Sequence, residues 1–510
     1  MRPVSPAELA LFHSFNRTER FRVEVRRRGS PWVDISERVL SISIDHSGDE
    51  PISTASLEIN DSWTIFGAAR SLNPLVLSSQ YNQPTPLLWP NNEVRIWVGL
   101  APLGEEPQTW HLLFHGVIGD SVRCRGSKAE RSLSLHLRDL GKRLQERMIV
   151  GEFLYGSKAG EAVVAVMQGL LNQHVPDLGI RLLVRDNPQF MIFPVKVGEC
   201  SVWEALQDLL KPTGYMCRYW FWPAGSTAYD CEGNPVPIEE DGYYLTVVDP
   251  KRDNTTAVDS LQAEVDTITE EDIELCDDTV RNSVWVRYYD RNTKNYMEVH
   301  RMDGDSVATY GERIIVVGQD DVPYIDTFTE AWDLAGVILH DLAEIPASDV
   351  LTCQLMPHLE VWDVLDVTNA RLSTGTTKLG ILSLRYDLAP GEPFTMTITG
   401  SRERVIGQIR TWLVSQGSST PATLPATLAG GTGQARVTIL PDGSCATEVV
   451  LEVVPPAEEP VDYYEWRWAL AGESKWHEAT TDIPVLRVTD VPPGSKVIWT
   501  CRARLKGGER

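Results

Sequence analysis

Hydrophobic and polar residues alternate along short segments through much of the chain. Before residue 150 the alternation recurs at 21–25, 39–44, 56–59, 93–98, 112–118 and 131–137. A period of two is typical of strands that bury one face. The spacing predicts one antiparallel β-barrel or sandwich over residues 1–150, interrupted by a Pro- and Asn-rich excursion at 72–92.

Helical spacing replaces this alternation in three places. Apolar residues recur every three or four positions over 158–173, with Ser157 as the expected cap. Two further helices are predicted from the capping-box pattern, in which a Ser or Thr precedes a Glu by three positions. The pattern occurs at Ser201 with Glu204, where the helix should end by 212–214, and at Thr327 with Glu330, where it should run over 327–345.

Strands resume after the second helix. The aromatic block 215–222 favours a core strand, and a base-stacking platform is the alternative that its few basic residues disfavour. We therefore expect a helix-containing α+β insert domain at 151–262. A second β domain with a helical insert is expected at 263–402, and its strands are predicted at 283–288, 313–317, 350–355, 364–367, 381–388 and 394–399. The turn at 389–393 joins the last two strands as a hairpin.

The end of the chain has a different composition. A short helix is predicted at 402–414 and a Ser-, Thr-, Pro- and Gly-rich linker at 415–433, so that residues 403–433 form a helix and flexible linker. A separate module follows at 434–510. Its predicted strands lie at 435–440, 447–454, 463–469, 485–488 and 496–504. This spacing, with Trp466 or Trp468 in mid-domain, suits a small immunoglobulin-like sandwich.

Charge and length narrow the function classes. A chain of 510 residues is too long for one core and should form three or four domains. The 71 Asp and Glu outnumber the 47 Lys and Arg, and a net charge of -24 disfavours binding to nucleic acid or anionic membranes. Acidic residues crowd 264–278. Five arginines within 20–28 are read either as a solvated strand face or as a docking site for an acidic neighbour.

The cysteines and the N-terminus indicate a reducing compartment. The eight cysteines are scattered without a C-x-x-C pair, and we expect most of them to be free, buried thiols. No signal peptide is visible over residues 1–20, and no segment approaches 18 continuous apolar residues. The chain is expected to be made, and to stay soluble, in the cytoplasm.

Candidate chemistry is sparse. His111 and His115 would share a helix face suited to zinc, but they lie on a predicted strand, where residues four apart are about 13 Å distant. Carboxylate pairs such as Asp277 with Asp278, and Asp320 with Asp321, are expected on the surface of so acidic a chain. The sequence contains no G-x-S-x-G elbow or Walker A loop. It therefore nominates no catalytic, cofactor-binding or metal-ligating residue, and no cofactor.

Four local patterns, in order, resemble the tail-hub family of tailed bacteriophages. They lie at 113–118 with 133–144, at 201–215, at 359–367 and at 381–399. The third resembles a Gly-Asp-Val-Val-x-Val motif of the family, with Trp362 where Gly is usual. The resemblance covers about residues 20–400. The segments 463–469 and 497–504 are similar to a fibronectin type III domain, although the sequence ends at Arg510, about where a final strand should begin. Either this copy lacks that strand or the natural polypeptide continues.

The resemblance implies a fold and a role. Hub proteins carry two related β-barrel domains, here 20–150 and 265–400, and form trimers in which six barrels match a sixfold tail tube. The chain would then be a virion protein of the tail tip, assembled in the host cytoplasm. It would contact the distal tail protein, the tape-measure protein and other tail-tip proteins, with transient passage of phage DNA through its channel. The acidic segment 264–278 is a candidate channel lining.

Two other classes stay open. A receptor-binding adhesin of the tail tip is favoured by the C-terminal module and its tryptophans, which would contact the host cell surface. A secreted carbohydrate-active enzyme with a fibronectin module is disfavoured because no signal peptide and no recognisable site are seen. We expect a structural protein and no enzyme.

Overall fold

The computed structural model describes most of residues 2–405 and six strands beyond them. The gaps before 405 are at 49, 62–86, 127–130, 264–267, 269, 276, 278, 319–320, 323, 345–346, 370–374 and 403–404, and the later strands cover 431–439, 445–453, 461–470, 477–481, 485–488 and 497–505. The chain divides into two compact units, Met1–Gly417 and Ser418–Arg510. Strands hold 47% of the residues and helices 17%, so the predicted mainly β class is confirmed.

Twelve strands of the first unit form two sets of six, which we call the first and second halves. The first half contains β1 (Arg17–Arg26), β3 (Val39–Ser47), β4 (Thr54–Asn60), β5 (Glu93–Pro102), β6 (Trp110–Gly126) and β7 (Arg131–Asp139). The second half contains β17 (Asp259–Gln262), β18 (Glu270–Leu275), β22 (Ala347–Gln354), β23 (Val364–Thr368), β24 (Thr376–Leu388) and β25 (Thr395–Arg402). The first half also includes α1 (Pro6–Phe12), β2 (Val33–Asp34) and η1 (Ser36–Arg38).

The two halves have the same strand order. Across the sheet the first half runs β3-β4-β7-β6-β5-β1, and the second runs β18-β22-β25-β24-β23-β17. Numbered along the chain within each half, both orders read 2-3-6-5-4-1. Neighbouring strands are antiparallel in both halves, except that β17 pairs with β23 in parallel whereas β1 pairs with β5 in antiparallel fashion. The halves are therefore two versions of one topology.

The two halves are joined edge to edge into one sheet. β24 pairs with β3, and the described strands form an open path of neighbours from β18 to β2, in which no closed barrel is found. One hydrophobic core contains side chains of both halves, among them Leu57 and Leu135 from the first and Leu351 and Ile398 from the second. The sheet is thus continuous across the join, and closure of each half into a barrel of its own is not seen among the described strands.

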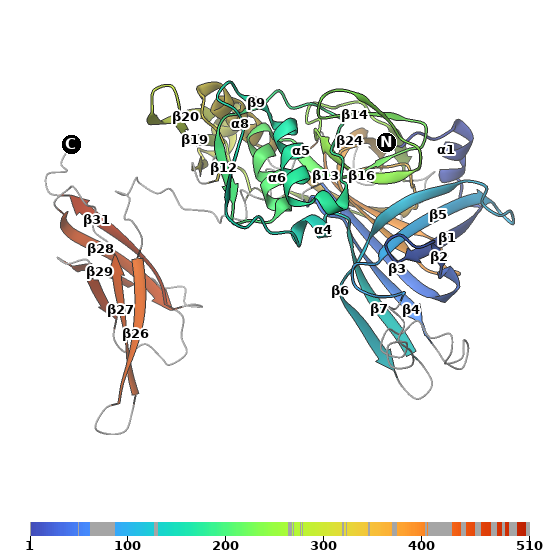
Figure 1. The fold of residues 1–510 in the computed structure, drawn as a ribbon, viewed down its shortest axis with the longest axis horizontal. Coiled ribbons are helices and arrows are strands. Elements are labelled where there is room, and N and C mark those ends of the chain that lie inside the picture. The colour runs from blue at the N-terminus through green and yellow to red at the C-terminus, as the bar shows by residue number, and fades with distance from the viewer. Residues whose placement is uncertain are drawn as a thin grey trace. The chain divides into compact units, whose positions relative to one another are not determined.

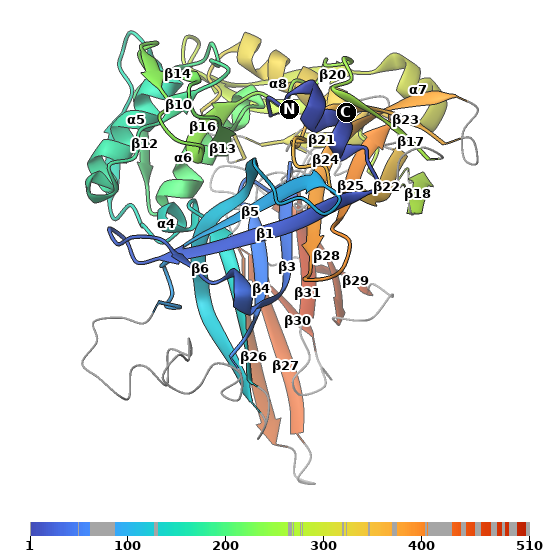
Figure 2. The ribbon, with the colours of Figure 1, turned by 90° about the vertical axis from the view of Figure 1, so that its right-hand side faces the viewer.

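Two inserts carry most of the helices. The insert between the halves contains α4 (Lys142–Gln145), β8 (Glu152–Tyr155), β9 (Glu161–Ala162), α5 (Val163–His174), η3 (Pro176–Leu178), β10 (Leu183–Val184), β11 (Met191–Ile192), β12 (Val195–Gly198), α6 (Val202–Leu210), η4 (Lys211–Thr213), β13 (Met216–Trp222), β14 (Thr227–Asp230), β15 (Pro235–Pro237) and β16 (Gly242–Val248). The insert between β18 and β22 contains β19 (Ser283–Asp290), β20 (Asn295–Met302), α7 (Gly304–Tyr310), β21 (Ile314–Val317) and α8 (Phe328–Leu342). Each insert has its own core. Their helices gather at one end of the sheet, and β6 extends away from them (Figures 1 and 2).

Local sequence rules explain where these helices begin. Both predicted capping boxes are present, with Ser201 capping α6 and Thr327 capping α8. The prediction that Ser157 caps the first helix is wrong, because β9 pairs with β11 and delays the start of α5 to Val163. The aromatic block is confirmed as a core strand: Tyr219 and Trp220 on β13 are buried and cannot stack on bases. The helix predicted at 402–414 does not begin at Arg402, which is the last residue of β25, and nearly all of its other residues lie outside the described part of the chain.

The second unit contains two small antiparallel sheets. Its strands are β26 (Gly431–Ile439), β27 (Cys445–Val453), β28 (Val461–Leu470), β29 (His477–Thr481), β30 (Val485–Val488) and β31 (Val497–Leu505). One sheet has the order β26-β27-β30 and the other β29-β28-β31. Trp466 is buried and donates its indole N–H to Thr481 (2.8 Å). This Trp is therefore part of the core and is not available as a surface contact.

Candidate functional site

The join between the halves is the first feature that could carry function. Residues 383–388 of β24 pair with residues 42–47 of β3, and we call this pairing the seam. The side chains on one face of the seam are buried; they are Ile42, Ile44, His46, Leu384, Tyr386 and Leu388. On the other face, exposed Arg385 lies opposite exposed Asp45. The seam therefore combines an apolar inner face with a pair of opposite charges outside, an arrangement that fixes the register of two strand edges.

The same backbone feature precedes the fourth strand of both halves. Asn91 (φ 70°) and Trp362 (φ 66°) are both in the left-handed region. The N–H of Asn91 donates to the carbonyl of Ile118 (2.9 Å), and that of Trp362 donates to the carbonyl of Ile381 (2.7 Å). Glycine is the residue that adopts this conformation at least cost, so neither Asn91 nor Trp362 is the residue that the backbone alone would favour. The match extends the likeness of the halves from strand order to single hydrogen bonds.

Trp362 has a packing role that a glycine would lack. Its ring stacks on Trp220 of the insert, with centroids 5.8 Å apart and planes 7° from parallel. The guanidinium of Arg218 lies 5.2 Å from the Trp362 ring. Trp362 therefore forms a contact between the second half and the insert.

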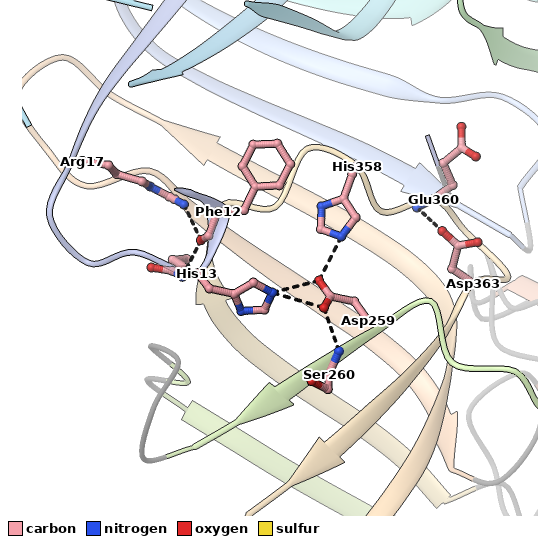
Figure 3. Close-up of polar contacts among 9 residues, drawn as sticks. Phe12, His13, Arg17, Asp259, Ser260, His358, Glu360 and Asp363 are labelled. Carbon is pink, nitrogen blue, oxygen red and sulfur yellow. Dashed lines mark hydrogen bonds and ion pairs between the residues drawn. The ribbon is translucent and has the colours of Figure 1, made fainter. Parts of the chain in front are cut away.

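The N-terminal segment holds the two halves together through a second cluster, which we call the clasp (Figure 3). His13 Nε2 lies 3.1 Å from both carboxylate oxygens of Asp259 on β17, and His358 Nε2 lies 2.9 Å from one of them. The amide of Ser260 donates to the same carboxylate at 2.8 Å. Phe12 stacks on His358 with ring centroids 5.2 Å apart. Residues from three distant parts of the chain thus meet at one carboxylate.

The chemistry of the clasp is that of a structural contact. Burial alone would raise the pKa of Asp259, but the hydrogen bonds from His13, His358 and the Ser260 amide hold this pKa well below its usual range. The carboxylate is therefore ionised and fully used as an acceptor. Ser260 contributes its backbone amide, and no group of metal-ligating residues that could hold an ion is found among the described residues.

A third polar cluster joins the first half to the insert. The guanidinium of Arg2 donates to the hydroxyl of Tyr243 (2.7 Å) and lies 4.4 Å from the ring of Phe221. Tyr243 donates to the carbonyl of Leu113, which also lies 2.9 Å from His46 Nε2. A small cavity of about 30 Å³ beside them is lined by Arg2, His46, Phe221 and Tyr243, among others. These bonds fix β6, the seam and the insert relative to one another.

Burial shifts two titrating groups near this cluster. Burial and the nearby charges of Arg2 and Arg218 lower the pKa of His46 to about 3, so the ring is neutral at physiological pH. Burial raises the pKa of Asp139 to about 7, although the amides of Ser53 and Gly141 each donate to it at 2.8 Å. His46 is therefore a titratable group on the buried face of the seam.

The residues considered for chemistry in the sequence are placed apart. His111 lies 3.8 Å from Glu8, and burial lowers its pKa to about 4. His115 is buried on the same strand and lies 4.0 Å from Glu93. Asp277 forms an ion pair with Arg313 (2.5 Å). The zinc interpretation of the two histidines, which the sequence disfavoured, finds no support among the described residues.

Some arginines of the basic stretch at 20–28 form ion pairs with acidic residues of the same chain. Arg20 lies 3.4 Å from Glu106, and Arg26 lies 2.6 Å from Glu93. Arg26 also covers the ring of Trp32 at 4.2 Å. Arg20 and Arg26 therefore have acidic partners within the chain. The thiols of Cys200, Cys217 and Cys231 are in no disulfide, and Cys217 is buried, as is Cys353.

A groove of about 1600 Å³ is lined by residues of both halves, among them Arg20, Ser43 and Arg385. No helix in the described part of the chain is long and apolar enough to cross a bilayer.

Several solved structures are similar to the chain. A tail protein from Neisseria meningitidis MC58 is 14% identical, with a TM-score of 0.49, and covers 75% of this chain and 97% of its own. A 43 kDa tail protein of prophage MuSo2 from Shewanella oneidensis is 12% identical, with a TM-score of 0.48, and covers 75% and 98%. A component of the type VI secretion system of E. coli is 12% identical, with a TM-score of 0.40, and covers 84% and 88%. No protein-family model and no curated protein sequence matches the chain.

Proposed function

We propose that this chain is a structural hub protein of a phage tail tip, in which three copies form a ring of six β units that caps the tail tube. The observation that carries the proposal is the repeated topology. Both halves have the strand order 2-3-6-5-4-1, and in both a residue with a left-handed backbone precedes the fourth strand. Two similar units in one chain allow a threefold assembly to present six similar surfaces. The motifs that resemble the hub family lie within these halves and the insert between them.

The seam supports the proposed ring because, within one chain, it joins two similar units through their strand edges. Strand edges offer unpaired N–H and C=O groups, and a neighbouring edge satisfies them. Within the chain, this is how the second half meets the first. A ring closes when every unit meets its neighbour in the same way.

The charge of the chain fits a channel for DNA. A net charge of -24 repels a polyanion, so DNA leaving through a ring of such chains would not adhere to its wall. Opening of the ring for ejection, and contacts with the distal tail and tape-measure proteins, follow from this role.

The second unit is proposed as a fibronectin type III-like sandwich. Its two sheets draw strands 1, 2 and 5 and strands 3, 4 and 6 in chain order, an interleaving that a sandwich of this class requires. The receptor-binding alternative would place the host contact on this unit. Binding of a 430–510 fragment to host cells, without binding by residues 1–410, would favour that alternative.

The mass of the purified full chain in solution tests the hub proposal. We expect three times the chain mass of 57.0 kDa, and images that show a threefold ring. A single-chain particle at every concentration would contradict the proposal, and hydrolysis of peptidoglycan would favour the enzyme alternative.

A further inference from the structure

Two strand edges of the first unit resemble the two edges that meet at the seam. At the seam, the fifth strand of the second half (β24) pairs with the second strand of the first half (β3). The corresponding strands are the fifth of the first half, β6, and the second of the second half, β18. The described strands place β22 beside β18, and they place β7 beside β6 from Val122 onward. Figure 2 shows β6 and β18 on opposite sides of the sheet.

Both fifth strands contain a bulge, and their pairing with the sixth strands aligns the two halves residue by residue. In β6, Ile118 lies opposite Leu137 before the bulge, and Val122 lies opposite Leu135 after it. In β24, Ile381 lies opposite Gly400 before the bulge, and Leu384 lies opposite Ile398 after it. Between these two pairs the sixth strand advances by two residues in each half, whereas β6 advances by four residues and β24 by three. Val122 therefore corresponds to Leu384, Arg123 to Arg385 and Arg125 to Asp387.

The second strands align through the same ladder. Leu135 of β7 lies opposite Leu57 of β4, and Ile398 of β25 lies opposite Leu351 of β22. Counting outward from these pairs, Ile44 lies opposite Ala55, and Ile273 lies opposite Asp349. The corresponding residues on the second strands are Ser43 with Asp272, Ile44 with Ile273, Asp45 with Glu274 and His46 with Leu275.

We infer that β6 of one copy pairs with β18 of a second copy of this chain, in antiparallel fashion and in the register of the seam. This inference rests on the proposed hub function. Transferring the seam register gives Arg123 opposite Glu274 and Arg125 opposite Asp272. On the other face it gives Val122 opposite Leu275 and Cys124 opposite Ile273.

The side chains fit this register on both faces. Arg123, Arg125, Asp272 and Glu274 are all exposed, and each assigned pair joins a cation to an anion as Arg385 and Asp45 do at the seam. Val122 packs against the main core, and Leu275 is 72% exposed at an edge strand where a neighbour would cover it. Acidic residues concentrate on the β18 edge and basic residues on the β6 edge, so a slip of one residue would place charges against apolar side chains.

The geometry also determines the type of assembly. Each copy offers one β6 edge and one β18 edge, so the contact is head to tail, and it forms a ring when the rotation closes. The acidic residues of β18 would then lie in the junction between copies, in place of the channel lining expected from the sequence.

Charge reversal on the full chain tests the inference. In R123E/R125E both assigned pairs become repulsive, and we expect the dissociation constant of the assembly to rise roughly tenfold to hundredfold. The variant R123E/R125E/D272R/E274R restores opposite charges at both pairs and should regain the assembly. R20E/R287E changes two exposed arginines elsewhere with the same change in net charge and should leave the mass unaltered. The measurement is mass by sedimentation, with circular dichroism melts to show that each variant is folded.

The outcomes separate this inference from the hub proposal. A three-chain wild type whose mass is unchanged in R123E/R125E overturns the assigned junction and leaves the hub proposal in place. A loss of assembly in R123E/R125E without recovery in the four-residue variant also overturns the assigned pairs. A wild type that stays a single chain at every concentration overturns both.

Discussion

Arg385 lies directly opposite Asp45 across the antiparallel pair that joins the two halves. The hydrogen bonds that Arg385 donates to Asp387 on the same strand, and the negative charges of Asp387 and Asp45, raise the pKa of Arg385. The two residues come from opposite ends of the first unit in sequence, and their position fixes the register of the seam. The stability of the joined sheet should therefore depend on the sign of these charges.

Reversing the charge at the seam should destabilise the first unit. In R385E, two carboxylates face each other across the strands, and we expect the free energy of unfolding to fall by about 1 kcal/mol. The double variant D45R/R385E should recover much of that loss. Urea denaturation of each variant gives the coupling, with R287E on β19 as a control in which an exposed arginine is reversed away from the seam. Additive effects of D45R and R385E would contradict a direct interaction.

Asn91 and Trp362 share a left-handed backbone but differ in their surroundings, and their substitutions should separate conformation from packing. N91G relieves the backbone but removes the side-chain oxygen that accepts from the buried Lys142 ammonium (2.9 Å), and we expect the free energy of unfolding to fall by about 1 kcal/mol. N91V loses the same acceptor and also strains the backbone, so it should lower the free energy of unfolding by about 2 to 3 kcal/mol. W362G should lose about 3 kcal/mol although glycine suits the backbone, since the stack on Trp220 disappears. Thermal unfolding measures all three. A stabilising W362G would show that the ring contributes little.

The clasp predicts a large effect for one carboxylate and none for the adjacent hydroxyl. D259A leaves the fully buried His358 without its acceptor, and we expect a loss of about 1 to 3 kcal/mol in the free energy of unfolding. S260A keeps the backbone amide that bonds Asp259 and should be neutral. The two variants are compared by urea denaturation. Equal effects of D259A and S260A would argue against the network as described.

His46 predicts how the first unit responds to acid. Its pKa is about 3 in the folded state and about 6.5 when unfolded. A lowered folded pKa contributes stability that is complete above pH 6.5 and is lost as the pH falls toward 3. The loss is on the order of 4 kcal/mol when complete. The variant H46Q, which has no titratable ring, should show a flatter stability profile between pH 6.5 and 3. An unchanged profile would mean that other groups control the acid response.

The local parts of the fold were predictable from the sequence. Ser201 and Thr327 mark two helix starts because a capping box is a short-range pattern, and the closing hairpin follows from its turn residues. The prediction from Ser157 was wrong because β9, which lies directly before α5, pairs with the distant strand β11. β20 was missed because seven of its eight residues are at least partly exposed and give no clear alternation.

The candidate site was less predictable, for a physical reason. Asp259, His13 and His358 are isolated polar residues in sequence, and only the fold brings them together. The pairing of Arg385 with Asp45 depends in the same way on contacts between distant strands. The capping box at Ser5 and Glu8 could have revealed α1, which carries Phe12 and His13 to the clasp. The resemblance to hub proteins suggested that the two halves are related, and the two halves do share one strand order.

A three-dimensional reconstruction of the purified full chain tests the central claim most directly. The account predicts a threefold ring with six similar β units, in which the first and second halves alternate and β6 of each copy lies beside β18 of the next. A particle with one chain, or a ring whose copies meet through other strands so that the two halves do not take equivalent places, would contradict it.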